Sequence, residues 1–187
     1  TPYASYPGGV ESANKNLQRV LESLGHQVEL VTADKGEPLP LLVRLERLII
    51  GLPAITAYRF KRHQDTFDLV FANGEHAYRI HHPRLVNLFH GCYFGYYEAM
   101  KKRSTLRQRL NIFRLATIQR IAAAYAWRVY AVSGYISNYL RKQGIASYGI
   151  LHNGVDTQAF IPASDDRQGM LTVGNNYWGK GFDILKR

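Results

Sequence analysis

The stretch LVNLFHG, residues 85–91, is a nearly continuous apolar run that ends in a histidine and a glycine. A second run of this kind, FDLVFAN (67–73), precedes it. Strands of a parallel sheet that is covered on both faces show such runs, because neither side of the strand meets water. The two runs therefore predict neighbouring strands of a parallel α/β sheet.

Helical and strand-like patterns alternate along the rest of the chain. Apolar residues at helical spacing predict a helix over 10–24, which Gly25 ends. The other predicted elements are a strand over 27–33, a helix over 39–63 broken near Gly51 and Pro53, a basic helix over 101–126, a strand over 128–133, a helix over 136–143 and a strand over 148–154. This alternation indicates a doubly wound, mostly parallel sheet.

A change in composition marks a domain boundary near the C-terminal end. Residues 157–169, TQAFIPASDDRQG, are rich in turn formers and acidic residues, as linkers are. MLTVG (170–174) then predicts a new strand, and GFDILKR (181–187) a helix. We expect one domain over 1–163, with a linker and the start of a second domain over 164–187.

Composition fits a soluble globular chain. The 187 residues are 46% hydrophobic and 20% charged, and Cys92 is the single cysteine. A chain of this size buries a sizeable core without disulfides. No stretch reaches the roughly 18 unbroken apolar residues of a membrane-spanning helix, and no secretory signal opens the sequence. We therefore expect a cytoplasmic protein.

The net charge of +10 comes from one part of the chain. Residues 99–155 contain ten Lys and Arg residues and no Asp or Glu, while acids and bases balance elsewhere. Such a surface attracts nucleic acid, phosphate-bearing substrates or acidic membranes. Candidates for contact with an anionic acceptor or membrane are Lys101, Lys102, Arg103 and Arg107. The alternative is an ordinary helix whose basic face is solvated.

Two short motifs are candidate ligand sites. The pair Gly8-Gly9 precedes the first helix, where backbone N–H groups and the helix dipole favour phosphate, although a plain turn would look the same. His90 ends an apolar strand, the edge at which open α/β sheets bind ligands. A neutral His90 could hydrogen-bond a sugar hydroxyl, and a protonated one could oppose a phosphate. A histidine that is merely satisfied in its loop is equally compatible with the sequence.

A third motif, VGNNYWGKGFD (173–183), sets glycines and Lys180 between a strand and a helix. It departs from the phosphate loop of nucleoside triphosphatases, because Gly181 stands where Ser or Thr would bind Mg²⁺. No spacing of His, Cys and carboxylates predicts a metal site.

Taken in order, PGGVESANKNLQRVLESLGHQVELVT, FDLVFANG, LVNLFHG, RVYAVS, ILHNGVDTQAFIP and LTVGNNYWGKGFDIL resemble retaining GT-B glycosyltransferases of the glycosyl-transferase group-one family. The resemblance implies two Rossmann-like domains, the first binding the acceptor and the second a nucleotide diphosphate sugar. It implies that Gly8 and Gly9 lie against the donor's phosphate and sugar, and that His90 is the catalytic histidine beside the transferred sugar. Lys180 would neutralise the leaving diphosphate, and no obligatory metal or other cofactor is expected.

The sequence departs from this family in three ways. It lacks the strand that normally precedes the glycine pair, Asn175 and Asn176 stand where the family has an arginine, and the chain ends before the paired glutamates that bind the donor. We therefore expect the parent enzyme to transfer a sugar with retention, and the 187 residues alone to be inactive.

Expected partners are a nucleotide-sugar donor, a carbohydrate or glycolipid acceptor that is anionic or lipid-linked, and an anionic membrane face. Three alternatives stay open at this point: a GT-B sugar-nucleotide epimerase, a basic module that binds nucleic acid or anionic surfaces, and a non-enzymatic partner domain. Nucleic acid is disfavoured, because aromatic residues that could stack with bases cluster at 92–100, outside the basic helix.

Overall fold

The computed structural model describes residues 8–34, 37–62 and 66–158. The chain divides into two compact units, Thr1–Val155 and Asp156–Arg187, and the first of these holds all the helices and strands given below. Lys180, the predicted strand over 170–174, the predicted helix over 181–187 and the predicted boundary between 163 and 164 lie outside the described residues and stay predictions.

The core of the first unit is a four-stranded parallel sheet. Its strands are β1 (Val70–Asn73), β2 (Leu85–Phe89), β3 (Arg128–Ala131) and β4 (Gly149–Ile150), and they pair in that order. The register aligns Val70 with Leu85, Val86 with Arg128 and Tyr130 with Gly149. All five residues of β2 are buried, as the run at 85–89 predicts. The predicted α/β class with a parallel sheet is confirmed.

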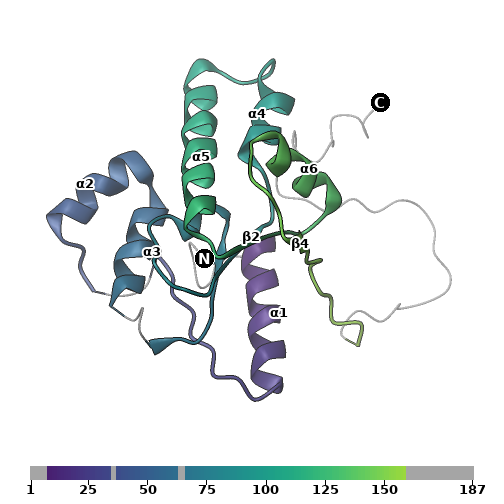
Figure 1. Ribbon diagram of the computed structural model, residues 1–187. Coiled ribbons are helices and arrows are strands. Elements are labelled where there is room, and N and C mark those ends of the chain that lie inside the picture. The colour runs from purple at the N-terminus through teal and green to yellow at the C-terminus, as the bar shows by residue number, and fades with distance from the viewer. Residues whose placement is uncertain (1–7, 35–36, 63–65, 159–187) are drawn as a thin grey trace. The chain divides into compact units, whose positions relative to one another are not determined.

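Helices join and cover the strands (Figure 1). They are α1 (Gly9–Ser23), α2 (Leu41–Ile50), α3 (Leu52–Lys61), the 3-10 helix η2 (Gly74–Ala77), α4 (Tyr93–Met100), α5 (Leu106–Tyr125) and α6 (Gly134–Lys142). The predicted break near Gly51 separates α2 from α3, and the φ of +86° at this residue is one that glycine adopts without strain.

Apolar side chains on the α3, α5 and α6 side of the sheet form two clusters. In the first, Phe60 of α3 packs with β1, Leu85 and Ala122 of α5. In the second, Phe89 packs with Ala123 of α5, with β3 and with α6. Asn73 lies one residue beyond buried Ala72, so it points to the opposite face, where it meets α1. Helices therefore lie on both faces of the sheet, as in a doubly wound fold.

The predicted strand over 27–33 is wrong. These residues pair with none of the described strands, and the carbonyl of Thr32 instead accepts a hydrogen bond from Arg59 Nη1 at 2.8 Å. A strand requires backbone hydrogen bonds to a neighbouring strand, and alternating apolar residues alone do not provide that neighbour.

The predicted basic helix over 101–126 begins too early. Lys101, Lys102 and Arg103 lie in the turn that follows α4, and α5 starts only after Thr105. Thr105 and Gln108 form a capping box, in which each side chain accepts from the other's backbone N–H. This cap satisfies the free N–H groups of the first turn and fixes the start of the helix.

Candidate functional site

The candidate site lies at the carboxyl ends of β1 and β2. Asn73 is the last residue of β1, and His90 follows directly after β2. Because the two strands are parallel and Asn73 is in register with Leu88, their ends meet at one edge of the sheet. This is the edge at which open α/β sheets bind their ligands.

Three side chains form a hydrogen-bonded row across this edge. His90 Nε2 lies 3.0 Å from Asn73 Oδ1, and Asn73 Nδ2 donates to Asn14 Oδ1 of α1 at 3.0 Å. Since the Asn73 amide donates toward Asn14, its oxygen is the acceptor for the imidazole. His90 therefore carries its proton on Nε2, and Nδ1 is the acceptor of the neutral ring.

The surroundings of His90 favour this neutral ring. Burial lowers its pKa, and the carboxylate of Glu11 in the first turn of α1 offsets only part of that effect. Of the two roles that the sequence leaves open, a neutral imidazole that hydrogen-bonds a hydroxyl fits this environment better than a cation facing a phosphate.

The glycine pair belongs to the same neighbourhood. Gly8 is the N-cap of α1 and Gly9 its first residue, and a Cβ built on Gly9 meets no atom within 4 Å. Glu11, two residues after Gly9 in the first turn, acts electrostatically on His90, so the start of α1 lies near the histidine. Asn14 Nδ2 is buried there and has no hydrogen-bond partner among the described residues, which leaves a donor unused next to the row.

A buried glutamine holds the turn after His90. Gln119 of α5 accepts from the Tyr93 backbone N–H at 3.0 Å and donates to the Gly91 carbonyl at 3.2 Å. Its amide nitrogen also lies 3.5 Å from Glu75 Oε2. The other carboxylate oxygen of Glu75, Oε1, accepts from the Tyr93 hydroxyl at 3.2 Å. Burial raises the pKa of Glu75. These contacts hold the backbone on both sides of Cys92, in the turn that directly follows His90 and Gly91.

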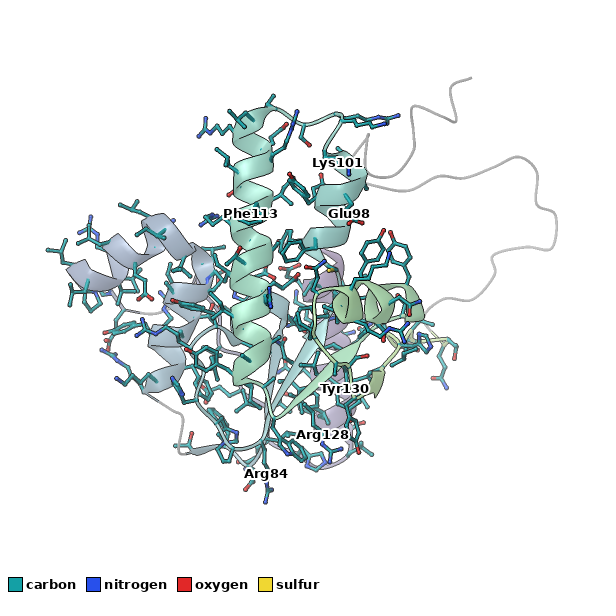
Figure 2. All side chains as sticks on the ribbon, turned by 45° about the horizontal axis from the view of Figure 1, so that its top comes forward. Arg84, Glu98, Lys101, Phe113, Arg128 and Tyr130 are labelled. Carbon is teal, nitrogen blue, oxygen red and sulfur yellow. The ribbon has the colours of Figure 1, made fainter. Side chains whose placement is uncertain are left out.

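The candidate acceptor-side cations lie away from this row. Lys101, Lys102, Arg103 and Arg107 are exposed at the end of α4 and the start of α5. The eight residues of α4 place that turn about 12 Å beyond Tyr93. Figure 2 shows Lys101 at this end, remote from Arg84 and Arg128 at the starts of β2 and β3. The structure links the helix that Gly8 and Gly9 begin to His90 through Asn14 and Asn73, and it places the four cations at the far end of α4.

Sequence reasoning missed Asn14, Asn73, Glu75 and Gln119. Asn73 carried the same signal as His90, namely a polar residue directly after an apolar run. Gln119 carried none, because a glutamine within a helix is usually solvated, and only its burial in the structure reveals its role.

Within the described ranges no three His, Cys, Asp or Glu side chains gather as metal ligands would. None of the helices in the described part of the chain has the length and hydropathy needed to cross a bilayer. That the reaction needs no metal stays a prediction.

A parallel α/β sheet with a polar row and a glycine-started helix at its carboxyl edge defines a Rossmann-like domain of the kind that forms half of a GT-B protein. Comparison with protein families is more specific: the model of Glycosyltransferase Family 4 matches residues 7–159. The chain belongs to this family, and the resemblance to glycosyltransferases is confirmed at that level. Comparisons with curated proteins and with solved structures gave no match.

Proposed function

We propose that this chain is the acceptor-side half of an enzyme that transfers a sugar from a nucleotide diphosphate sugar, with retention of configuration, to an anionic or lipid-linked acceptor at the cytoplasmic face of a membrane. The His90–Asn73–Asn14 row beside the start of α1 is the observation that carries this proposal. In it, Gly8 and Gly9 face the donor's phosphate and sugar, and Lys180 neutralises the leaving diphosphate. No cofactor or metal takes part.

The geometry supports a definite role for His90. Its Nε2–H is engaged by Asn73, so Nδ1 can accept a hydrogen bond from a sugar hydroxyl. Departure of the diphosphate builds positive character on the sugar carbon, and a neutral, fixed acceptor stabilises that sugar without introducing another cation. Asn73 and Asn14 are positioning residues, because they act through the imidazole.

We expect His90→Ala in the parent enzyme to lower kcat about 10²- to 10³-fold, the usual loss for one fixed polar contact to the transition state. Steady-state kinetics with a labelled nucleotide sugar measures it. His26→Ala, at an exposed position after α1, is the matched control and should leave kcat unchanged. Unchanged turnover in the His90 variant would remove this histidine from the mechanism.

The same assay separates the competing functions. A transferase places the label on an acceptor, whereas an epimerase leaves it on a nucleotide sugar of altered configuration. We expect the 187 residues by themselves to form neither product. Label transfer by the isolated chain would contradict this expectation.

The turn at Lys101–Arg103 is the proposed contact with acidic lipid. Its three side chains are exposed, and each cation near an acidic surface contributes about 1 kcal/mol. We expect K101Q/K102Q/R103Q to bind acidic vesicles about 100-fold more weakly in sedimentation at low salt. The control K15Q/R19Q/R84Q removes the same charge from exposed positions elsewhere and should change binding far less. Equal losses in the two variants would show that net charge alone, and not this turn, attracts the vesicle.

A further inference from the structure

Helix α2 carries its apolar side outward. Leu41, Leu42, Leu45, Leu48 and Ile49 are 51% to 79% exposed, although the helix has ten residues in all. At 100° per residue these five positions span an arc of about 120°. Val43 is buried on the opposite side. A surface helix normally shows the reverse arrangement, so this face is built to be covered by something apolar.

Positive charge borders the apolar arc. Arg44 is exposed and lies about 40° beyond Leu48 at one margin of the arc, whereas exposed Arg47 lies on the side away from the arc. The acid of this helix, Glu46, lies on the other side and accepts from Arg79 at 2.9 Å. The apolar arc of α2 is therefore bordered by Arg44 at one margin and by the Glu46–Arg79 ion pair at the other.

The surface continues onto α5. Arg114 of α5 donates to the carbonyl of Ile49, which joins the end of α2 to the middle of α5. Leu110 and Leu106 lie one and two turns before Arg114 on the same side of α5, and both are exposed. Arg107 and Arg109 are exposed on the same projecting part of the helix, where residues 105–111 have no buried member (Figure 1).

We propose that the exposed apolar face of α2, together with Leu106 and Leu110, inserts into the headgroup and acyl boundary of an anionic bilayer. This deepens the proposed function, on whose membrane-presented acceptor it rests, by replacing a purely electrostatic contact with insertion. Leucines enter the acyl boundary, while arginine stems extend along it and leave their guanidinium groups among acidic headgroups.

The charges favour a bilayer over a second copy of this chain. A two-fold contact through the apolar arc of α2 would bring Arg44 of one copy close to Arg44 of the other, with Arg107 and Arg109 close to the rim. The cores of such interfaces are poor in charged residues, and like charges there oppose association. Acidic headgroups neutralise the same arginines.

The test compares two double variants that differ only in location. L45Q/I49Q replaces side chains that are 51% and 69% exposed, and V20Q/L24Q replaces a pair at the same spacing on α1 that are 55% and 68% exposed. Glutamine retains helix propensity, and circular dichroism checks that both variants fold. In sedimentation with phosphatidylcholine vesicles containing phosphatidylglycerol, we expect L45Q/I49Q to bind at least tenfold more weakly than the parent chain, and V20Q/L24Q to bind within twofold of it.

A depth measurement tests insertion itself. Fluorescence of Leu48→Trp, corrected for the parent chain, should be quenched by lipids brominated on the acyl chain, whereas Val20→Trp should not be. Equal vesicle binding by L45Q/I49Q and the parent, or no quenching at position 48, overturns insertion. If insertion is overturned but K101Q/K102Q/R103Q still weakens vesicle binding, the electrostatic contact of the proposed function is retained. A parent dimer that L45Q/I49Q converts to monomer would also overturn the proposal, by assigning α2 to self-association.

Discussion

Replacement of Phe89 by alanine is expected to lower the free energy of unfolding by about 3–5 kcal/mol, the usual cost of removing a fully buried aromatic ring. Phe89 is 0% exposed at the end of β2, between the α5 side of the sheet and α6. Its neighbours Ala123 and Ala131 are small and sit on packed elements, so they cannot move into the cavity. The loss should therefore fall toward the upper end of that range.

Chemical denaturation followed by circular dichroism measures this change. Phe71→Ala is the matched control, because Phe71 lies in the same sheet but is 38% exposed on the edge strand β1. We expect it to cost about 2–3 kcal/mol, in proportion to the smaller area it buries. A Phe89 variant no less stable than the Phe71 variant would mean that β2 is not the centre of the core.

The position of Phe89 also explains why part of the fold could be predicted. A strand buried on both faces is mostly apolar, and residues 85–89 show this pattern locally, with Asn87 as the one polar member. Residues 70–73 carry a similar apolar run, although only Val70 and Ala72 of that strand are buried. The helix over 10–24 and the break at Gly51 are local in the same sense, because spacing and backbone conformation decide them. These are the elements that the sequence predicted correctly.

Residues 27–33 show where local reasoning stops. The alternation of apolar and polar residues suits a strand, but a strand requires a neighbouring strand to which it can hydrogen-bond. Which strands become neighbours is decided by the whole sheet and not by the local sequence. Helix α4 escaped prediction for a related reason. Gly95 looks like a loop residue, yet a Cβ there would lie 2.9 Å from Cδ1 of Tyr139, so close packing against α6 requires glycine within the helix.

The start of α5 could have been located from the sequence. Thr105 and Gln108 have the spacing of a capping box, and this signal outweighs the run of helix-compatible residues at 101–103. The residues of the candidate site also divide into those that the sequence indicates and those that only the structure reveals. His90 and the glycine pair follow from strand and helix ends, whereas Gln119 acts through burial that only the three-dimensional structure reveals.

Replacement of His76 by glutamine is expected to remove a large, separable part of the acid sensitivity of the fold. His76 is buried in η2, and its Nδ1 lies 3.1 Å from the Thr56 hydroxyl, which donates to the Leu52 carbonyl. Burial lowers the pKa of His76 to about 3, from an ordinary value of 6.5. Below pH 6.5 His76 therefore binds a proton in the unfolded chain but stays neutral in the folded chain. The free energy of unfolding falls by about 1.4 kcal/mol for each pH unit over this range.

Between pH 7 and pH 4.5 the parent chain should accordingly lose about 2.7 kcal/mol more stability than His76→Gln, as measured by denaturation at each pH. Adjacent Glu75 acts in the opposite direction: burial raises its pKa, so its contribution to stability is present in acid and is lost as the pH rises through the folded pKa. Both chains contain Glu75, so the difference between their curves isolates the histidine. His26→Gln, at an exposed position, should follow the parent curve. Parallel curves for the parent and His76→Gln would show that His76 is protonated as readily in the folded chain as in the unfolded chain. His76 in η2 would then have to be more exposed to solvent than the structure indicates.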